Sequence, residues 1–161
     1  MAGRILALDY GRARIGIAIA EVAAGLPRPL ASLERVNRNE DMRRLREMVR
    51  EHAVRQIIVG LPLRLDGTRG EMAEEAARFA QRVHKQLGLP VEMVDERLTS
   101  WEAERQLEEQ HGRRFHPVHA APQHASKKSS GRHVGKTSVD AMAAAIILKE
   151  YLDRQRTKPA A

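Results

Sequence analysis

Acidic residues stand at the ends of three apolar segments, where a carboxylate is costly unless something positive compensates it. Asp9 closes the first apolar run, Asp95 and Glu96 close a later one, and Asp140 comes just before the last. If they converge, they form an oxygen-rich set that favours hard divalent cations, Mg²⁺ or Mn²⁺. Two such ions, about 4 Å apart, would clamp the attacking and leaving oxygens of a phosphoryl transfer.

Each of these carboxylates also has an ordinary structural explanation. Asp140 could complement the positive end of a helix dipole, and Asp9 could bind the amides of the turn that follows it. Asp95 or Glu96 could form a weak surface ion pair with Arg97. Singly, these explanations are favoured. Their common placement at the ends of elements favours one shared site.

Hydrophobic patterning predicts the strands that would position them. A turn joins the strands over residues 5–8 and 15–20, which we expect to be antiparallel. The strand over residues 56–60 has no polar face, as in a buried parallel strand. The carboxyl ends of parallel strands meet at one edge of a sheet, where Asp9 and Glu96 would both lie. The five expected strands cover residues 5–8, 15–20, 30–36, 56–60 and 91–94.

The segments between and after these strands have helical spacing. We expect a helix from Asp41 with Asn39 as its N-cap, and another that Thr68 and Glu71 cap and Gly88 ends. Two further helices are expected over residues 99–110 and 138–152. Together these elements predict an α/β three-layer domain with a mixed sheet of about five strands.

Positive charge is concentrated in one segment of this 161-residue chain, whose formal net charge is +7. The length fits a single domain over residues 1–161. Between Gln110 and Val139 there is no acidic residue, and we expect a basic flexible loop over 112–136 and a disordered tail over 154–161. The six basic residues of that segment are Arg113, Arg114, Lys127, Lys128, Arg132 and Lys136.

Composition excludes several kinds of function. The chain has no cysteine, which rules out disulfides, thiolate zinc sites and cysteine nucleophiles. Only 3% of the residues are aromatic, which argues against recognition of single strands by stacked bases. Five histidines lie between residues 111 and 133, and their irregular spacing favours a solvated loop over a metal site. No apolar run approaches the ~20 residues of a membrane span, and we expect a cytoplasmic protein without membrane attachment.

Four motifs, at residues 9–18, 58–68, 95–100 and 139–148, resemble the YqgF/RuvX family of RNase H-like proteins, and the resemblance covers nearly the whole chain. It implies an RNase H-like fold, a divalent-metal nuclease and processing of the 5′ end of pre-16S ribosomal RNA in ribosome biogenesis. Asp9, Glu96 and Asp140 match the family's acidic triad, which leaves Asp95 as a residue that supports the ligands. The chain departs from the family at Arg64-Leu65, where Asn-Met is common, and in its longer basic loop.

Our hypothesis is therefore a metal-dependent endonuclease that hydrolyses phosphodiesters of structured nucleic acid, with Asp9 bridging two ions. Alternatives are a Holliday junction resolvase that acts on four-way DNA, a nucleic-acid-binding protein without catalysis and, less favoured, an actin-like ATPase, whose fold needs two such domains. Cutting a symmetric junction would require a homodimer, and the sequence leaves the native substrate and the oligomeric state open. The expected phosphate contacts are Arg12, Arg14, Arg97, Lys127, Lys128, Arg132 and Lys136.

Overall fold

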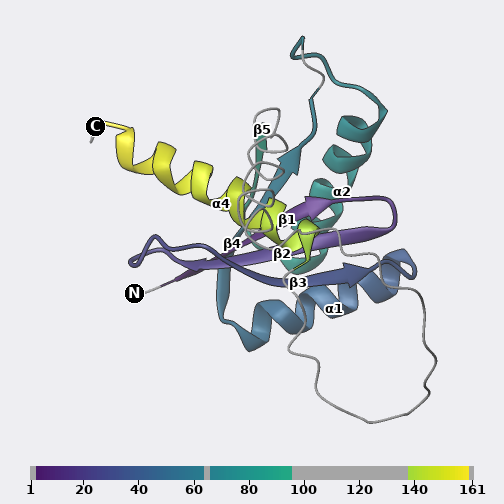
Figure 1. Cartoon of the computed structure of the whole chain (residues 1–161). Helices are drawn as coiled ribbons and strands as arrows, with labels where there is room; N and C mark the ends of the chain where they lie inside the picture. Colours follow the sequence, from purple (N-terminus) through teal and green to yellow (C-terminus); the bar gives the residue numbers. More distant parts are fainter. Residues whose placement is uncertain (1–2, 64–65, 96–137, 160–161) are drawn as a thin grey trace, which may run out of the picture.

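The computed structural model describes residues 3–63, 66–95 and 138–159, and Figure 1 shows their arrangement. In chain order, the described elements are β1 (Arg4–Tyr10), β2 (Arg14–Glu21), β3 (Arg28–Glu34), α1 (Arg38–Glu51), β4 (Val54–Leu61), α2 (Glu71–Leu87), β5 (Val91–Asp95) and α4 (Val139–Thr157). The helix expected over 99–110 and the basic loop 112–136 lie outside the described residues.

The strands form one mixed sheet in the order β3-β2-β1-β4-β5. The pairs β1–β2 and β2–β3 are antiparallel, whereas β1–β4 and β4–β5 are parallel. Helices α1 and α2 cover one face of this sheet and α4 covers the other (Figure 1). The expected three-layer domain with a mixed five-stranded sheet is confirmed.

Alternating side chains of β1 divide the core into two halves. Leu6 and Leu8 pack with α1 and α2, whereas Ile5 and Ala7 pack beneath α4. Small residues of α4 such as Ala144, which is fully buried, let this helix approach the sheet closely. No helix in the described part of the chain is both long and apolar enough to cross a membrane.

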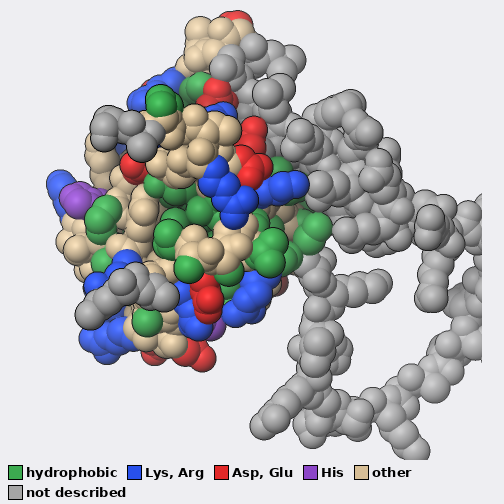
Figure 2. All heavy atoms as spheres, turned by 90° about the vertical axis from the view of Figure 1, so that its left-hand side faces the viewer, with side chains coloured by type: hydrophobic (Ala, Val, Ile, Leu, Met, Phe, Trp, Pro, Cys, Tyr) green, Lys and Arg blue, Asp and Glu red, His purple; other side chains and the backbone are tan. Residues whose placement is uncertain are grey.

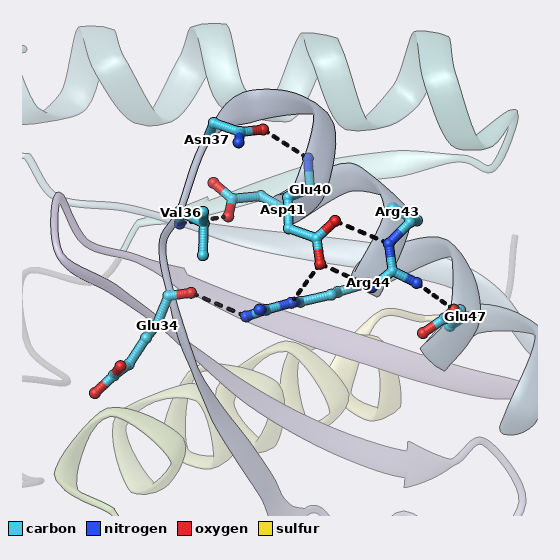
Figure 3. A network of polar contacts seen from close by, with 8 residues as sticks. All are labelled: Glu34, Val36, Asn37, Glu40, Asp41, Arg43, Arg44 and Glu47. Atoms are coloured by element: carbon cyan, nitrogen blue, oxygen red, sulfur yellow. Dashed lines mark hydrogen bonds and ion pairs between the residues drawn. The ribbon is translucent and has the colours of Figure 1, made fainter.

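Helix α1 begins at Arg38, earlier than predicted, because Asn37 rather than Asn39 is its N-cap. The side-chain oxygen of Asn37 accepts a hydrogen bond from the backbone amide of Glu40 at 2.9 Å. Asp41 therefore lies inside the first turn instead of starting the helix. Its buried carboxylate accepts a hydrogen bond from the amide of Val36 at 3.1 Å (Figure 3). This pairs two backbone amides at the start of the helix.

The ends of the other helices also correct the sequence predictions. Helix α2 has Gly70 at its N-cap without a side-chain cap, and Thr68 instead donates to Asp66 through its hydroxyl at 2.7 Å. Its C-terminus at Gly88 is as expected, with a left-handed φ of 69°. Helix α4 continues to Thr157, so residues 154–157 are helical rather than part of a disordered tail.

The amino edge of β1 differs in character from the edge where β1 ends. Figure 2 shows apolar side chains gathered there, with Lys and Arg side chains among them. Val22 and Leu26 in the β2–β3 connection are 53% and 77% exposed. A hollow of about 370 Å³ at this edge is lined by Ile5, Val22, Gly25, Gln56, Tyr151, Leu152, Gln155 and Arg156. The acidic residues Asp9 and Asp95 lie at the opposite edge, where β1 and β5 end.

One position in the connection between α1 and β4 is conformationally strained. Ala53 has φ 51°, and no other non-glycine residue in the described ranges has a positive φ. Glycine tolerates this left-handed conformation without a steric penalty. We expect Ala53→Gly to raise the free energy of unfolding by about 0.5–1 kcal/mol, measured by urea denaturation.

Ala77, in the middle of α2, provides the matched control because its backbone is helical. There the same change should lower the free energy of unfolding by about 1 kcal/mol. Loss of stability in Ala53→Gly would show that Ala53 contributes more through its side chain than it loses through strain.

Candidate active site

Three parallel strands end at one edge of the sheet, and two of them, β1 and β5, carry acidic residues there. Leu8 of β1 lies opposite Val59 of β4, and Val59 lies opposite Met93 of β5. Asp9 is one residue beyond this row on β1, and Asp95 is two residues beyond it on β5. The structure therefore places both carboxylates at the carboxyl edge, as predicted from the sequence. Glu96 lies outside the described residues.

The alternation of the strands decides which face each carboxylate belongs to. Ala7 packs beneath α4, so Asp9, two residues later, belongs to the α4 face. On β5, Val94 packs beneath α4 and Met93 packs toward α1 and α2. Asp95 is two residues after Met93 and therefore belongs to the same face as Met93, opposite the face of Asp9. This fits the expectation that Asp95 does not share Asp9's role.

Gly16 brings the start of α4 onto the sheet beside Asp9. It is the cross-strand partner of Asp9 in the β1–β2 pair. A Cβ atom added at Gly16 would overlap the backbone carbonyl of Asp140. The first turn of α4 is therefore seated directly on the β2 backbone, and Asp140 lies next to the strand pair that carries Asp9. A glycine inside a strand signals such a close approach, although we did not predict this contact.

The carboxylate of Asp140 is held by two strands. Its Oδ2 accepts hydrogen bonds from Arg14 Nε on β2 at 2.9 Å and from Ser32 Oγ on β3 at 3.3 Å. The side chain of Asp140 is 32% exposed and that of Arg14 is 58% exposed, so solvent and ligands can reach both. Asp140 also occupies the first turn of α4, where the helix dipole favours it. The dipole alone would not require partners on β2 and β3.

Arg12 lies elsewhere, on the side of α2. Its guanidinium forms ion pairs with Glu75 at 2.8 Å and with Glu71 at 3.7 Å. The hydrogen bond from Arg12 lowers the pKa of the Glu75 carboxyl, and Glu75 raises the pKa of Arg12. The structure thus brings together Asp9, Arg14 and Asp140 and separates Arg12 from them. The remaining predicted phosphate contacts, Arg97, Lys127, Lys128, Arg132 and Lys136, lie outside the described residues.

The donor chemistry of this edge fits a hard divalent cation. Asp9 and Asp140 offer carboxylate oxygens on the same face, and the cationic Arg14 is drawn to Asp140. Within residues 3–63, 66–95 and 138–159, no group of three His, Cys, Asp or Glu side chains forms a complete metal site. A third ligand would have to come from the rest of the chain, where the predicted Glu96 lies.

The strand order and the helices on both faces of the sheet are those of an RNase H-like α/β fold. The structure of Thermus thermophilus RuvC in complex with a Holliday junction substrate has a similar fold, with a TM-score of 0.51 and 14% identity over 96% of each chain. Residues 3–154 match the family described as "RuvX: Holliday junction resolvase". The chain belongs to the RuvX family.

Relatives in this family align over nearly the whole chain. A protein from Anaeromyxobacter dehalogenans strain 2CP-C is 40% identical over 152 residues, which cover 94% of this chain and 98% of the relative. A protein from Koribacter versatilis strain Ellin345 is 38% identical over 153 residues, with 95% and 88% coverage. Both carry the name "Putative pre-16S rRNA nuclease".

The close contact at Gly16 leads to a first test of the site. Gly16→Ala must push the first turn of α4 away from β2, because the clash is with backbone and not with a flexible side chain. We expect the free energy of unfolding to fall by about 1–3 kcal/mol in chemical denaturation. Gly3→Ala is the control, since its added methyl meets only the flexible side chain of Arg55 at 3.3 Å. Equal stabilities of the two variants would contradict the seating of α4 on Gly16.

Proposed function

We propose that this protein is a metal-dependent endonuclease that hydrolyses phosphodiester bonds of structured nucleic acid, with the 5′ end of pre-16S rRNA as its substrate. The observation that carries this proposal is the seating of Asp140 on the cross-strand partner of Asp9 at the carboxyl edge. The names of the relatives support the ribosomal RNA substrate. The description of the family supports four-way DNA as the alternative substrate.

The residues that would hold the cation are Asp9 and Asp140, with Glu96 as the third ligand. Glu96 follows Val94 by two residues in the sequence, and Val94 packs on the face that also carries Asp9. Mg²⁺ or Mn²⁺ bound there would supply positive charge to the phosphoryl group and make water a better nucleophile. Aspartate and glutamate oxygens are the ligands that these ions prefer.

The neighbours of Asp140 prepare it for this role. Arg14 and Ser32 donate to the same oxygen, Oδ2, so they fix the orientation of the carboxylate. Arg14 is largely exposed, and its guanidinium has further donors for a phosphate oxygen of the substrate. We therefore assign Arg14 two tasks, orienting Asp140 and holding the phosphate that flanks the scissile bond.

We assign the other predicted contacts to the nucleic-acid backbone. Arg97 and the basic loop over 112–136 would gather phosphates near the carboxylates without reading sequence. Arg12 is bound to Glu75 on the side of α2 and does not contact Asp140, which makes it a weaker candidate than Arg14. The protein would act as one domain over residues 1–161 in the cytoplasm, and cutting a four-way junction would require a homodimer.

Asp9→Asn tests the catalytic role of the carboxylate pair. The amide keeps the shape of the side chain and removes the charge that holds a divalent cation, so cleavage should fall at least 100-fold while binding is retained. Cleavage is measured with Mg²⁺ or Mn²⁺ on a pre-16S rRNA fragment and on a four-way DNA junction, and binding by gel shift in EDTA. Asp153→Asn, an exposed position on α4, is the matched control.

The two substrates separate the alternatives. Cleavage of the RNA alone supports the ribosomal role, and cleavage of the junction alone supports resolution. Binding without metal-dependent cleavage of either would make the protein a binding module. Wild-type cleavage rates in Asp9→Asn would refute the assignment of the carboxylate pair.

The basic loop is tested through the salt dependence of binding. Replacement of Lys127, Lys128 and Arg132 by Gln should reduce the slope of log affinity against log salt concentration by about 2 to 3 in magnitude. Each lost phosphate contact lowers the magnitude of this slope by about 0.7 to 0.9. Cleavage at saturating substrate should be unchanged. The control replaces Lys149, Arg154 and Lys158 of the C-terminal region, which also removes three charges. An unchanged slope in the loop variant would show that the loop does not touch the nucleic acid.

A further inference from the structure

Helices α1 and α2 run side by side in the same direction on the sheet face opposite α4. Each begins at the carboxyl edge, because β3 and β4 both end there, and each leads back to the start of the next parallel strand. Arg46 of α1 donates to the backbone carbonyl of Gln86 on α2 at 3.4 Å. On α2, Arg82 lies one turn before Gln86, and Arg78 lies one turn before Arg82. On α1, which runs in the same direction, Arg38 lies about two turns before Arg46.

These three residues, Arg38, Arg78 and Arg82, form what we call the arginine stripe. Burial lowers the pKa of the Arg82 guanidinium, and the charges of Arg38, Arg35 and Arg78 lower it further. Arg38 is also the first residue of α1, where the helix dipole disfavours a positive charge. The repulsion is therefore concentrated on Arg38 and Arg82, since Arg78 also lies near the negative charge of Glu75.

The carboxylates around the stripe already have other partners. Asp41 binds Arg35 at 3.2 Å, Glu75 binds Arg12 at 2.8 Å, and Glu40 binds Arg43 and Arg44. The close-up of α1 in Figure 3 shows Glu40 with Arg43 and Arg44. In the part of the chain that the structure describes, none of the three stripe arginines has a side-chain hydrogen bond or an ion pair.

A network of polar contacts joins helices α1 and α2, which carry the stripe, to the end of β1. Tyr10 packs on Phe79 of α2 with ring centroids 5.0 Å apart, and its hydroxyl donates to Glu75 at 3.2 Å. Arg35 donates to the Tyr10 hydroxyl at 2.9 Å and is anchored by Asp41, which is only 1% exposed. The scaffold around the stripe is therefore fixed before any ligand arrives. Because Tyr10 directly follows Asp9 on β1, adjacent residues of one strand belong to this network and to the candidate active site.

We propose that the arginine stripe is a second phosphate-binding surface for the nucleic-acid substrate, on the opposite face of the sheet from Asp9 and Asp140. The inference rests on the proposed function, since it takes the ligand to be a nucleic acid. Arginine forks bind phosphate oxygens in pairs, and a polyanion relieves the mutual repulsion of the stripe. A structured substrate that passes around the carboxyl edge would contact the stripe and the carboxylates together. Such contacts position the backbone and carry no sequence information.

The double variant Arg38→Gln/Arg82→Gln tests the proposal. Binding to an RNA hairpin and to a four-way DNA junction is measured in EDTA over a range of salt concentrations. We expect the slope of log affinity against log salt to flatten by about 1.4 to 1.8, as for two lost phosphate contacts. Without nucleic acid, the melting temperature should be unchanged or higher, because two repelling cations have been removed.

The control is Arg50→Gln/Arg154→Gln, which removes the same charge near the C-terminal ends of α1 and α4. Its slope should stay within about 0.3 of the wild type. The proposal is overturned if both double variants flatten the slope equally, or if the stripe variant binds both probes like the wild type.

The same experiment separates this proposal from the nuclease assignment. Binding in EDTA does not depend on cleavage. A wild-type protein that binds but never cleaves would refute the nuclease activity, and the salt slopes of the variants would still test phosphate binding by the stripe. A cleaving enzyme with an unchanged slope in the stripe variant would refute the stripe alone.

Discussion

The contact between the β2 backbone and the first turn of α4 is the constraint on which the candidate site depends. Gly16 has no side chain, so the carbonyl of Asp140 can rest directly on the strand that pairs with Asp9. A larger residue there would lift the helix and change the distance between the two carboxylates. The bonds from Arg14 and Ser32 then fix the Asp140 side chain, so backbone packing and side-chain hydrogen bonds specify one position.

The strand alternation of β1 separates two polar systems at the same edge. Asp9 belongs to the α4 face, together with Asp140 and Arg14, whereas Tyr10 packs with Phe79 and joins Arg35 and Glu75 on the other face. The two carboxylates of the first system are partly exposed, which suits a cation. The second is tied to buried Asp41 and lies beside arginines. The adjacent residues Asp9 and Tyr10 therefore belong to the carboxylate site on one face and to the arginine-containing network on the other.

Local signals in the sequence predicted most elements, because hydrophobic period and flanking breakers are local properties. They also placed Asp9 and Asp95 at one sheet edge and Asp140 in a first helical turn. Helix starts were less predictable, since Asn37 and Asn39 are both good caps and only the packing of Asp41 with Arg35 selects Asn37. The partners of Asp140 were unpredictable from local pattern, because Arg14 and Ser32 are 126 and 108 residues away in the chain.

That long separation has a consequence for how the protein acquires its chemistry. The first carboxylate lies on the first strand and the second on the last described helix, so the pair exists only after α4 has docked on the completed sheet. Contacts between such distant residues form late, because the loop they close must lose its entropy first. A chain that emerges from its N-terminus would hold Asp9 without Asp140 until α4 has been synthesised. On the proposed function, an unfinished molecule of this kind would lack one carboxylate of the metal site and would not cleave nucleic acid.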